Sequence, residues 1–182
     1  MVGWIILVVV IVVALWFVGT YNMFVTLRNR VKNAWAQIDV QLKRRYDLIP
    51  NLVETVKGYA AHEKEVFEKV TELRTRAMSA SGPKEVGEAN NMLTGALKTL
   101  FAVAEAYPEL KANENFLKLQ EELTNTENKI AFSRQFYNDI VMRYNMAQEK
   151  IPAALVARVM GLTPSEYYPV PEEERGNVKV SF

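Results

Sequence analysis

Few residues in this chain are of the types that carry out acid–base or metal chemistry. His62 is the one histidine, and the HEKEV segment that it begins lacks the second histidine of an HExxH zinc motif. Glu121 and Glu122 are neighbouring carboxylates, but adjacent residues on a helix point in different directions. The chain has no cysteine, and its 8 glycines form no phosphate-binding loop or dinucleotide-binding motif. We therefore predict no catalytic residue, no metal and no cofactor, and a surface or helix-terminal position for His62.

Two charged residues interrupt the apolar stripe of a predicted long helix. Glu127 and Arg134 are seven residues apart, so they share the helix face on which core residues are expected. A charge left unpaired in a core is strongly destabilising, so such residues must pair or face water. In one interpretation, the stripe drifts and Ala131 takes the core position. In the other, Glu127 and Arg134 form a polar seam that engages Arg44 or Arg45 and specifies helix register or a subunit contact.

A second group of charges begins where the first apolar segment ends. Arg28, Arg30 and Lys32 lie within about 10 Å of Leu27, the last residue of the uncharged stretch, if the segment is helical. This is close to one Debye length, so each cation could gain about 1 kcal/mol from anionic lipid. These three residues are our candidates for contact with lipid headgroups. The alternative is that they fix topology and solubility alone.

The apolar segment itself has the properties of a membrane anchor. Residues 1–27 contain no Asp, Glu, Lys, Arg or His. Crossing a bilayer takes about 20 apolar residues in a helix, so residues 1–21 are long enough. A cleaved secretory signal is the alternative, but the positive n-region is missing and the apolar stretch is too long. Aromatic residues near both ends of the segment fit an interfacial aromatic belt; these are Trp4, Trp16, Phe17 and Tyr21.

The distribution of cations predicts the orientation of this anchor. Six Lys and Arg residues lie between residues 28 and 45, and Asp39 is the one acid in that stretch. By the positive-inside rule, we expect the N-terminus outside and the C-terminal part of the chain in the cytoplasm, behind a single membrane pass. The formal net charge of +1 gives no reason to expect a nucleic-acid partner.

Beyond the anchor, the apolar pattern is helical nearly everywhere. Apolar residues recur at steps of three and four through residues 31–60, 66–77, 83–107 and 113–150, and IPAALVARVMG after them predicts a short amphipathic helix. The SASGP segment at 79–83 predicts a turn. We therefore predict an all-α protein with a transmembrane anchor (1–21), an antiparallel four-helix-type bundle with long first and last helices (22–163), and a C-terminal tail (164–182).

Two further positions are singled out by this pattern. The apolar phase continues through Pro50, which indicates a kinked helix with Pro50 as a candidate hinge. At the C-terminus, Val178, Val180 and Phe182 alternate with polar neighbours, as in a strand. A lone strand needs an edge to pair with, so we expect a flexible tail in a monomer and a docked tail in an oligomer.

Two blocks of the sequence resemble a known family. VKNAWAQIDVQLKRRYDLIPNLVETVKGYAAHE (31–63) and ANENFLKLQEELTNTENKIAFSRQFYND (112–139) are similar to the LemA family of bacterial membrane proteins, as are the apolar N-terminus and the VKVSF ending. The resemblance implies an N-terminal anchor, a helical-bundle domain and the bacterial cytoplasmic membrane as location. It implies no catalytic residue set. Other membrane-organising proteins and membrane-linked proteolysis or stress responses are the associations that it suggests.

Two functions compete on this basis. The leading hypothesis is a non-catalytic, membrane-anchored scaffold that assembles with itself, with membrane lipids and other membrane proteins as further partners. The alternative is a sensor or adaptor that binds a partner protein and relays its state through the membrane helix, with Pro50 as the hinge. An enzyme is the third hypothesis.

Overall fold

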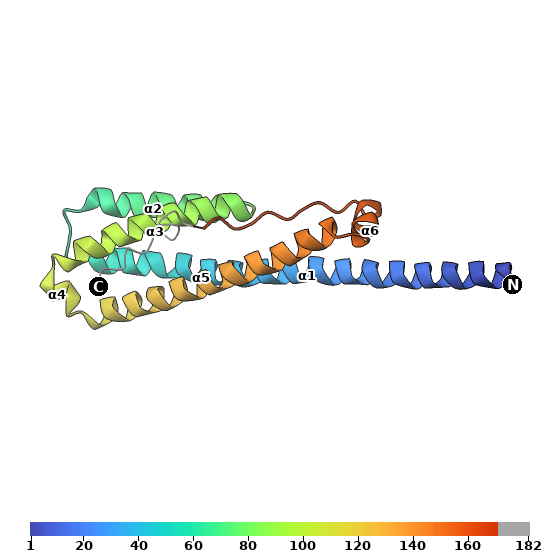
Figure 1. The fold of residues 1–182 in the computed structure, drawn as a ribbon. Coiled ribbons are helices and arrows are strands. Elements are labelled where there is room, and N and C mark those ends of the chain that lie inside the picture. The colour runs from blue at the N-terminus through green and yellow to red at the C-terminus, as the bar shows by residue number, and fades with distance from the viewer. Residues whose placement is uncertain (171–182) are drawn as a thin grey trace, which may run out of the picture. The chain divides into compact units, whose positions relative to one another are not determined.

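The computed structural model describes residues 1–170, and those residues are helical apart from the connections. Six helices follow one another (Figure 1): α1 (Val2–Lys57), α2 (Lys64–Ser79), α3 (Pro83–Glu105), α4 (Pro108–Lys111), α5 (Glu114–Glu149) and α6 (Ala153–Val159). The predicted all-α fold with long first and last bundle helices is confirmed. The candidate docking residues Val178, Val180 and Phe182 lie outside the described residues.

The ends of the helices follow local sequence signals. The predicted turn before α3 is present, with Gly82 at φ +79° and Pro83 in the first helical turn. A positive φ favours glycine, and proline suits a helix start because the N–H it lacks has no partner there. The polar break predicted after residue 107 contains one helical turn, α4, which the sequence analysis did not predict; Pro108 begins it.

The chain forms two compact units, and α1 and α5 each contribute residues to both. Among the described residues, the first unit consists of residues 1–37 and 135–166, and the second of residues 38–134 and 167–170. The domain boundaries at residues 21 and 163 stay predictions from the sequence.

The first unit has a small core next to the apolar segment of α1. Phe24, Val156 and Ala157 are buried together, and Ala147, Ala153, Met160 and Leu162 pack against them. Farther along α1, Trp35 meets Tyr137 of α5 edge to face, with 5.5 Å between ring centroids.

In this unit, hydrogen bonds join the chain segment that follows α6 to helix α5. The Tyr137 hydroxyl donates to the carbonyl of Glu166 at 2.8 Å. Asn145 donates to the carbonyl of Ser165 at 3.0 Å, and its own side-chain oxygen accepts from the Ser165 N–H at 2.8 Å. Polar contacts thus hold the segment that follows α6.

The second unit is a bundle with a continuous aliphatic core. Successive helices reverse direction in Figure 1, and α2 and α3 lie side by side. The core residues recur at helical spacing on each element; on α1 and α2 they are Ile38, Leu42, Tyr46, Ile49, Leu52, Val53, Val56, Phe67, Val70, Leu73 and Ala77, and on α3 and α5 they include Leu93, Leu97, Leu100, Phe116 and Leu123. This packing explains why long helices of modest intrinsic propensity are stable.

Helix α1 continues through Pro50, and the second unit supplies a partner for the carbonyl that proline leaves free. Proline has no N–H to donate to the residue four positions earlier, which here is Tyr46. Arg74 of α2 donates its Nε–H to that Tyr46 carbonyl at 2.8 Å. The break in the helical hydrogen-bond ladder is therefore bridged by a neighbouring helix.

Candidate functional site

The N-terminal segment of α1 is apolar and uncovered. Among the described residues, α1 is the one helix long and apolar enough to cross a membrane, and none of its most apolar window is buried. A core helix of a soluble protein would be largely buried, so this segment fits a membrane protein. The predicted belt residues Trp4, Trp16, Phe17 and Tyr21 are 75%, 37%, 37% and 44% exposed.

The candidate lipid-binding cations lie within α1, after its apolar segment, and are exposed. Arg28 and Lys32, one turn apart, line a pocket of about 370 Å³ together with the loop after α6, from Met160 to Ser165. Arg30 is exposed and does not line that pocket. The arrangement offers two positive charges to an anionic group beside the end of the apolar segment.

The most unusual side chain of the second unit is a buried arginine. Arg45 is 1% exposed, and its Nε lies 2.8 Å from Oε1 of Glu127 on α5. Its Nη2 donates to Thr94 Oγ1 at 2.7 Å, and its Nη1 lies 3.4 Å from Asn90 Oδ1. A guanidinium has five N–H donors, so a buried one needs several partners of this kind.

Asn90 connects this arginine to Tyr46. Its amide donates to the Tyr46 hydroxyl and to the carbonyl of Val86, each at 2.8 Å. Asn90 is 2% exposed, and it places a polar side chain at a position of α3 where the apolar stripe predicts an apolar core residue. Helices α1, α3 and α5 therefore share one polar network inside an apolar bundle.

The electrostatics of Arg45 explain why Glu127 is needed. Burial lowers the pKa of Arg45 from its ordinary value, and the carboxylate of Glu127 opposes that shift. A buried ion pair whose partner is removed leaves an uncompensated charge in a low-dielectric interior. Glu127 thus stabilises the charged form of a residue that the core would otherwise disfavour.

The remaining polar-seam candidates have different surroundings. Arg44 pairs with Glu122, and both side chains are about half exposed. Arg134 lines the same cavity of about 230 Å³ as Arg45 and Glu127. Ala131, the alternative core residue, is exposed, so that interpretation is wrong.

Three members of this site were not predicted from the sequence: Asn90, Thr94 and Tyr168. Tyr168 is 2% exposed and lines the cavity, and burial raises its pKa to about 12. Next to it, Pro169 lies against Gly87 of α3. Asn90 could have been found as a polar residue on the apolar stripe of α3, and Thr94 as a polar residue one turn later, whereas the SEYYPVP segment gives no signal for the burial of Tyr168.

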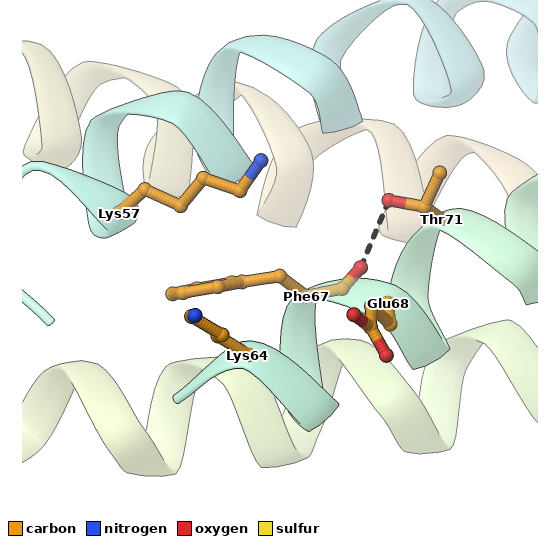
Figure 2. A pocket seen from close by; sticks show the side chains of 5 residues that line it. All are labelled: Lys57, Lys64, Phe67, Glu68 and Thr71. Atoms are coloured by element: carbon orange, nitrogen blue, oxygen red, sulfur yellow. Dashed lines mark hydrogen bonds between the residues drawn. The ribbon is translucent and has the colours of Figure 1, made fainter. Parts of the chain in front are cut away.

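A third pocket, of about 400 Å³, lies where α1 ends and α2 begins (Figure 2). Lys57 Nζ is 5.9 Å from the centre of the Phe67 ring, and Figure 2 shows the Lys64 side chain close to the same ring. The Thr71 hydroxyl donates to the Phe67 carbonyl at 2.8 Å. Lys57 also pairs with Glu54 at 3.0 Å, and His62 is exposed in the turn between the helices.

Neither the Arg45 cavity nor the pocket of Figure 2 contains a recognisable catalytic arrangement. In the Arg45 cavity, the carboxylate of Glu127 is paired with the guanidinium of Arg45. The pocket of Figure 2 holds no nucleophile next to a base. Within residues 1–170, no three His, Asp or Glu side chains gather as metal ligands would.

Together, these features define a helical bundle organised around a buried arginine and continuous with an apolar helix that fits a membrane. The chain belongs to the LemA family, whose family model matches residues 34–182.

Several relatives support this assignment. The magnetosome proteins MamQ 1 and MamQ 2 of Paramagnetospirillum magneticum are each 26% identical in an alignment of 174 residues, and the match covers 81% of this chain and 64% of theirs. Protein LemA of Metamycoplasma hominis is 27% identical over 169 residues, covering 91% of this chain and 76% of that protein. The chain therefore spans just under two thirds of the length of the MamQ relatives.

Proposed function

We propose that this protein is a non-catalytic scaffold that is anchored in the bacterial cytoplasmic membrane by a single pass and assembles with itself. One observation carries the proposal: α1 runs without a break from an uncovered apolar segment into the core of a bundle. An uncovered apolar helix needs lipid around it, and the same helix then fixes the bundle to the membrane.

The cations that follow the apolar segment support an orientation with the bundle in the cytoplasm. Arg28, Arg30 and Lys32 flank the cytoplasmic end in this proposal, as the positive-inside rule requires. A test uses the absence of cysteine from the chain. A membrane-impermeant maleimide added to intact spheroplasts should label a Val2→Cys variant and spare a variant with cysteine at the exposed Gln37 position, Gln37→Cys, which becomes reactive after lysis. The reverse pattern would overturn the orientation alone.

Self-assembly is supported by the tether and by exposed apolar side chains on the bundle. Confinement to a membrane raises the effective concentration of neighbouring copies, so modest interfaces suffice. In the second unit, Phe132 is 73% exposed and Val40 is 64% exposed, and both are available for contact with another copy. The alternating tail residues Val178, Val180 and Phe182 are further docking candidates in this proposal.

Two differently tagged copies test the assembly. When both are expressed together and extracted in mild detergent, one tag should recover the other copy. Mixing the two after separate extraction controls for exchange in detergent. Failure to recover the second copy from co-expressing cells would remove self-assembly from the proposal and leave the anchor intact.

The continuity of α1 favours one alternative, a sensor or adaptor that relays the state of a bound partner. The Pro50 position is held by the bond from Arg74 to the Tyr46 carbonyl, so a change at α2 could alter the helix there. A Pro50→Ala variant that folds and assembles normally but loses a membrane-linked phenotype would favour the relay. A variant that is only altered in stability would favour the scaffold.

A further inference from the structure

Helix α6 turns apolar side chains away from the protein. Leu155 and Val159, one turn apart, are 60% and 74% exposed, and Ile151 just before the helix is 88% exposed. Between them, Val156 and Ala157 are 1% and 4% exposed and face the core of the first unit. The short helix is therefore apolar on both its inner and its outer side, and nothing in the described chain covers the outer side.

The position of α6 indicates what covers it. Its inner face packs against Phe24 of α1, and Phe24 follows Tyr21, the end of the predicted span, by three residues. At the rise of an α-helix this is about 4.5 Å along the axis. Helix α6 thus lies beside the first turn of α1 beyond the span, at the depth where headgroups meet acyl chains.

The charges around α6 are those of a surface that meets anionic lipid. Lys150 and Arg158 are exposed at its two ends, and Arg28 and Lys32 line the pocket formed with the loop that follows it. Glu149 is the one acid between residues 140 and 165. Helices that lie in a membrane interface combine an apolar face with flanking cations in this way.

We infer that α6 is a second membrane contact: Ile151, Leu155 and Val159 enter the interface of the bilayer, and the neighbouring cations bind anionic headgroups. The inference rests on the proposed membrane anchor. The bilayer is the occupant because the exposed side chains lie next to the end of a helix that is itself uncovered and apolar on all sides from Met1 to Leu15. The contact holds the first unit against the membrane surface, whereas the anchor alone would leave it free to tilt.

Spin labels on the full-length protein test this. Because the chain has no cysteine, single variants Leu155→Cys and Val159→Cys carry one label each. Val12→Cys, exposed within the apolar segment, reports on the anchor. Gln37→Cys is the aqueous control, since it is exposed on the same helix about 24 Å beyond Tyr21. The protein is placed in vesicles of phosphatidylcholine and phosphatidylglycerol, and collisions with oxygen, which prefers lipid, are compared with those of a water-soluble nickel chelate.

We expect the ratio of oxygen to nickel collisions at residues 155 and 159 to exceed that at residue 37 several-fold and to be lower than that at residue 12. An aqueous ratio at 155 and 159 with a lipid ratio at 12 would overturn the inference and leave the anchor standing. Low collision rates with both reagents at 155 and 159 would assign the surface to a protein contact and overturn it too. An aqueous ratio at residue 12 would overturn the anchor itself and this inference with it.

Discussion

The two compact units of this protein differ in where their large apolar side chains lie. In the second unit, aliphatic residues fill the interior and surround one guanidinium, that of Arg45. In the first unit, most large apolar side chains of residues 1–18 and two of α6, Leu155 and Val159, are on the surface, and a small buried core contains Phe24, Val156 and Ala157. Hydrogen bonds to the segment after α6 supplement that small core.

The difference teaches that apolar residues do not by themselves identify the interior. In water, an uncovered row of large aliphatic side chains is rare on a monomer, and a buried charge needs partners. The second unit follows both rules. The first unit departs from the rule on exposed aliphatic side chains, and a lipid environment would explain why they are uncovered. Four predictions test the comparison, in order of expected effect.

The largest effect should come from leaving Arg45 without its carboxylate. We expect Glu127→Ala to lower the free energy of unfolding by about 3 kcal/mol, near the lower end for breaking a buried pair, because water reaches the Glu127 side chain. The control is Glu122→Ala, which breaks the exposed pair with Arg44 and should cost at most about 1 kcal/mol. Urea unfolding of the full-length protein in mild detergent measures both. Equal costs would mean that burial of Arg45 is not the source of the effect.

The next effect concerns the contact between α3 and the Tyr168–Pro169 segment. A Cβ on Gly87 would lie 2.4 Å from the Pro169 ring, whereas a Cβ on Gly95 of the same helix meets nothing within 4 Å. We therefore expect Gly87→Ala to destabilise the second unit by about 1–3 kcal/mol through overpacking. Gly95→Ala should be neutral or stabilising by up to about 1 kcal/mol, from helix propensity. A neutral Gly87→Ala would show that the segment does not pack on α3.

A smaller effect is expected for the hydrogen bond that closes the first unit. Tyr137→Phe removes the bond to the Glu166 carbonyl and should cost about 1 kcal/mol. Burial raises the pKa of Tyr137 to about 12, and the negative charge of Glu166 adds to this shift. The folded protein then keeps the phenol proton above pH 10, where the unfolded chain loses it. The contribution of Tyr137 to stability is therefore complete below about pH 10 and falls between about pH 10 and 12.

The same pH dependence is expected in both units. Tyr137→Phe should flatten the loss of stability between about pH 10 and 12, and so should Tyr168→Phe in the second unit, because burial raises that pKa to about 12 as well. Thermal melts across this range provide the measurement. A wild-type slope in either variant would contradict the burial of that phenol.

The smallest effect is the coupling between Arg74 and Pro50. Arg74→Ala should cost less in a Pro50→Ala background than in the wild type, because an alanine at position 50 has an N–H that can donate to the Tyr46 carbonyl. We expect a coupling of about 0.5–1 kcal/mol from the double-mutant cycle. Strict additivity would mean that Arg74 does not compensate for the proline.

Much of the fold could be predicted from the sequence, because helical periodicity is a local signal. The pattern predicted a helix over 83–107 and a helix over 113–150, and the structure has Pro83–Glu105 and Glu114–Glu149. The turn at Gly82 and Pro83 was likewise readable from two residues. These elements depend on spacing and on glycine and proline, which act within a few residues.

The site was harder to predict from the sequence because it depends on contacts between segments that are far apart in the chain. Arg44 and Arg45 are adjacent and equally charged, and only the packing of α1 against α3 and α5 decides that Arg45 is buried with Glu127. The burial of Tyr168 and the contact of α6 with Phe24 join residues more than 70 positions apart. No periodicity within one helix carries that information.

The mass of the full-length protein in mild detergent, measured by size exclusion with light scattering, tests the proposed scaffold most directly. After subtraction of the detergent, we predict a defined multimer of several chains that persists on dilution. A single-chain mass at all concentrations would contradict self-assembly, and the search would then turn to a different membrane protein as the partner of this bundle.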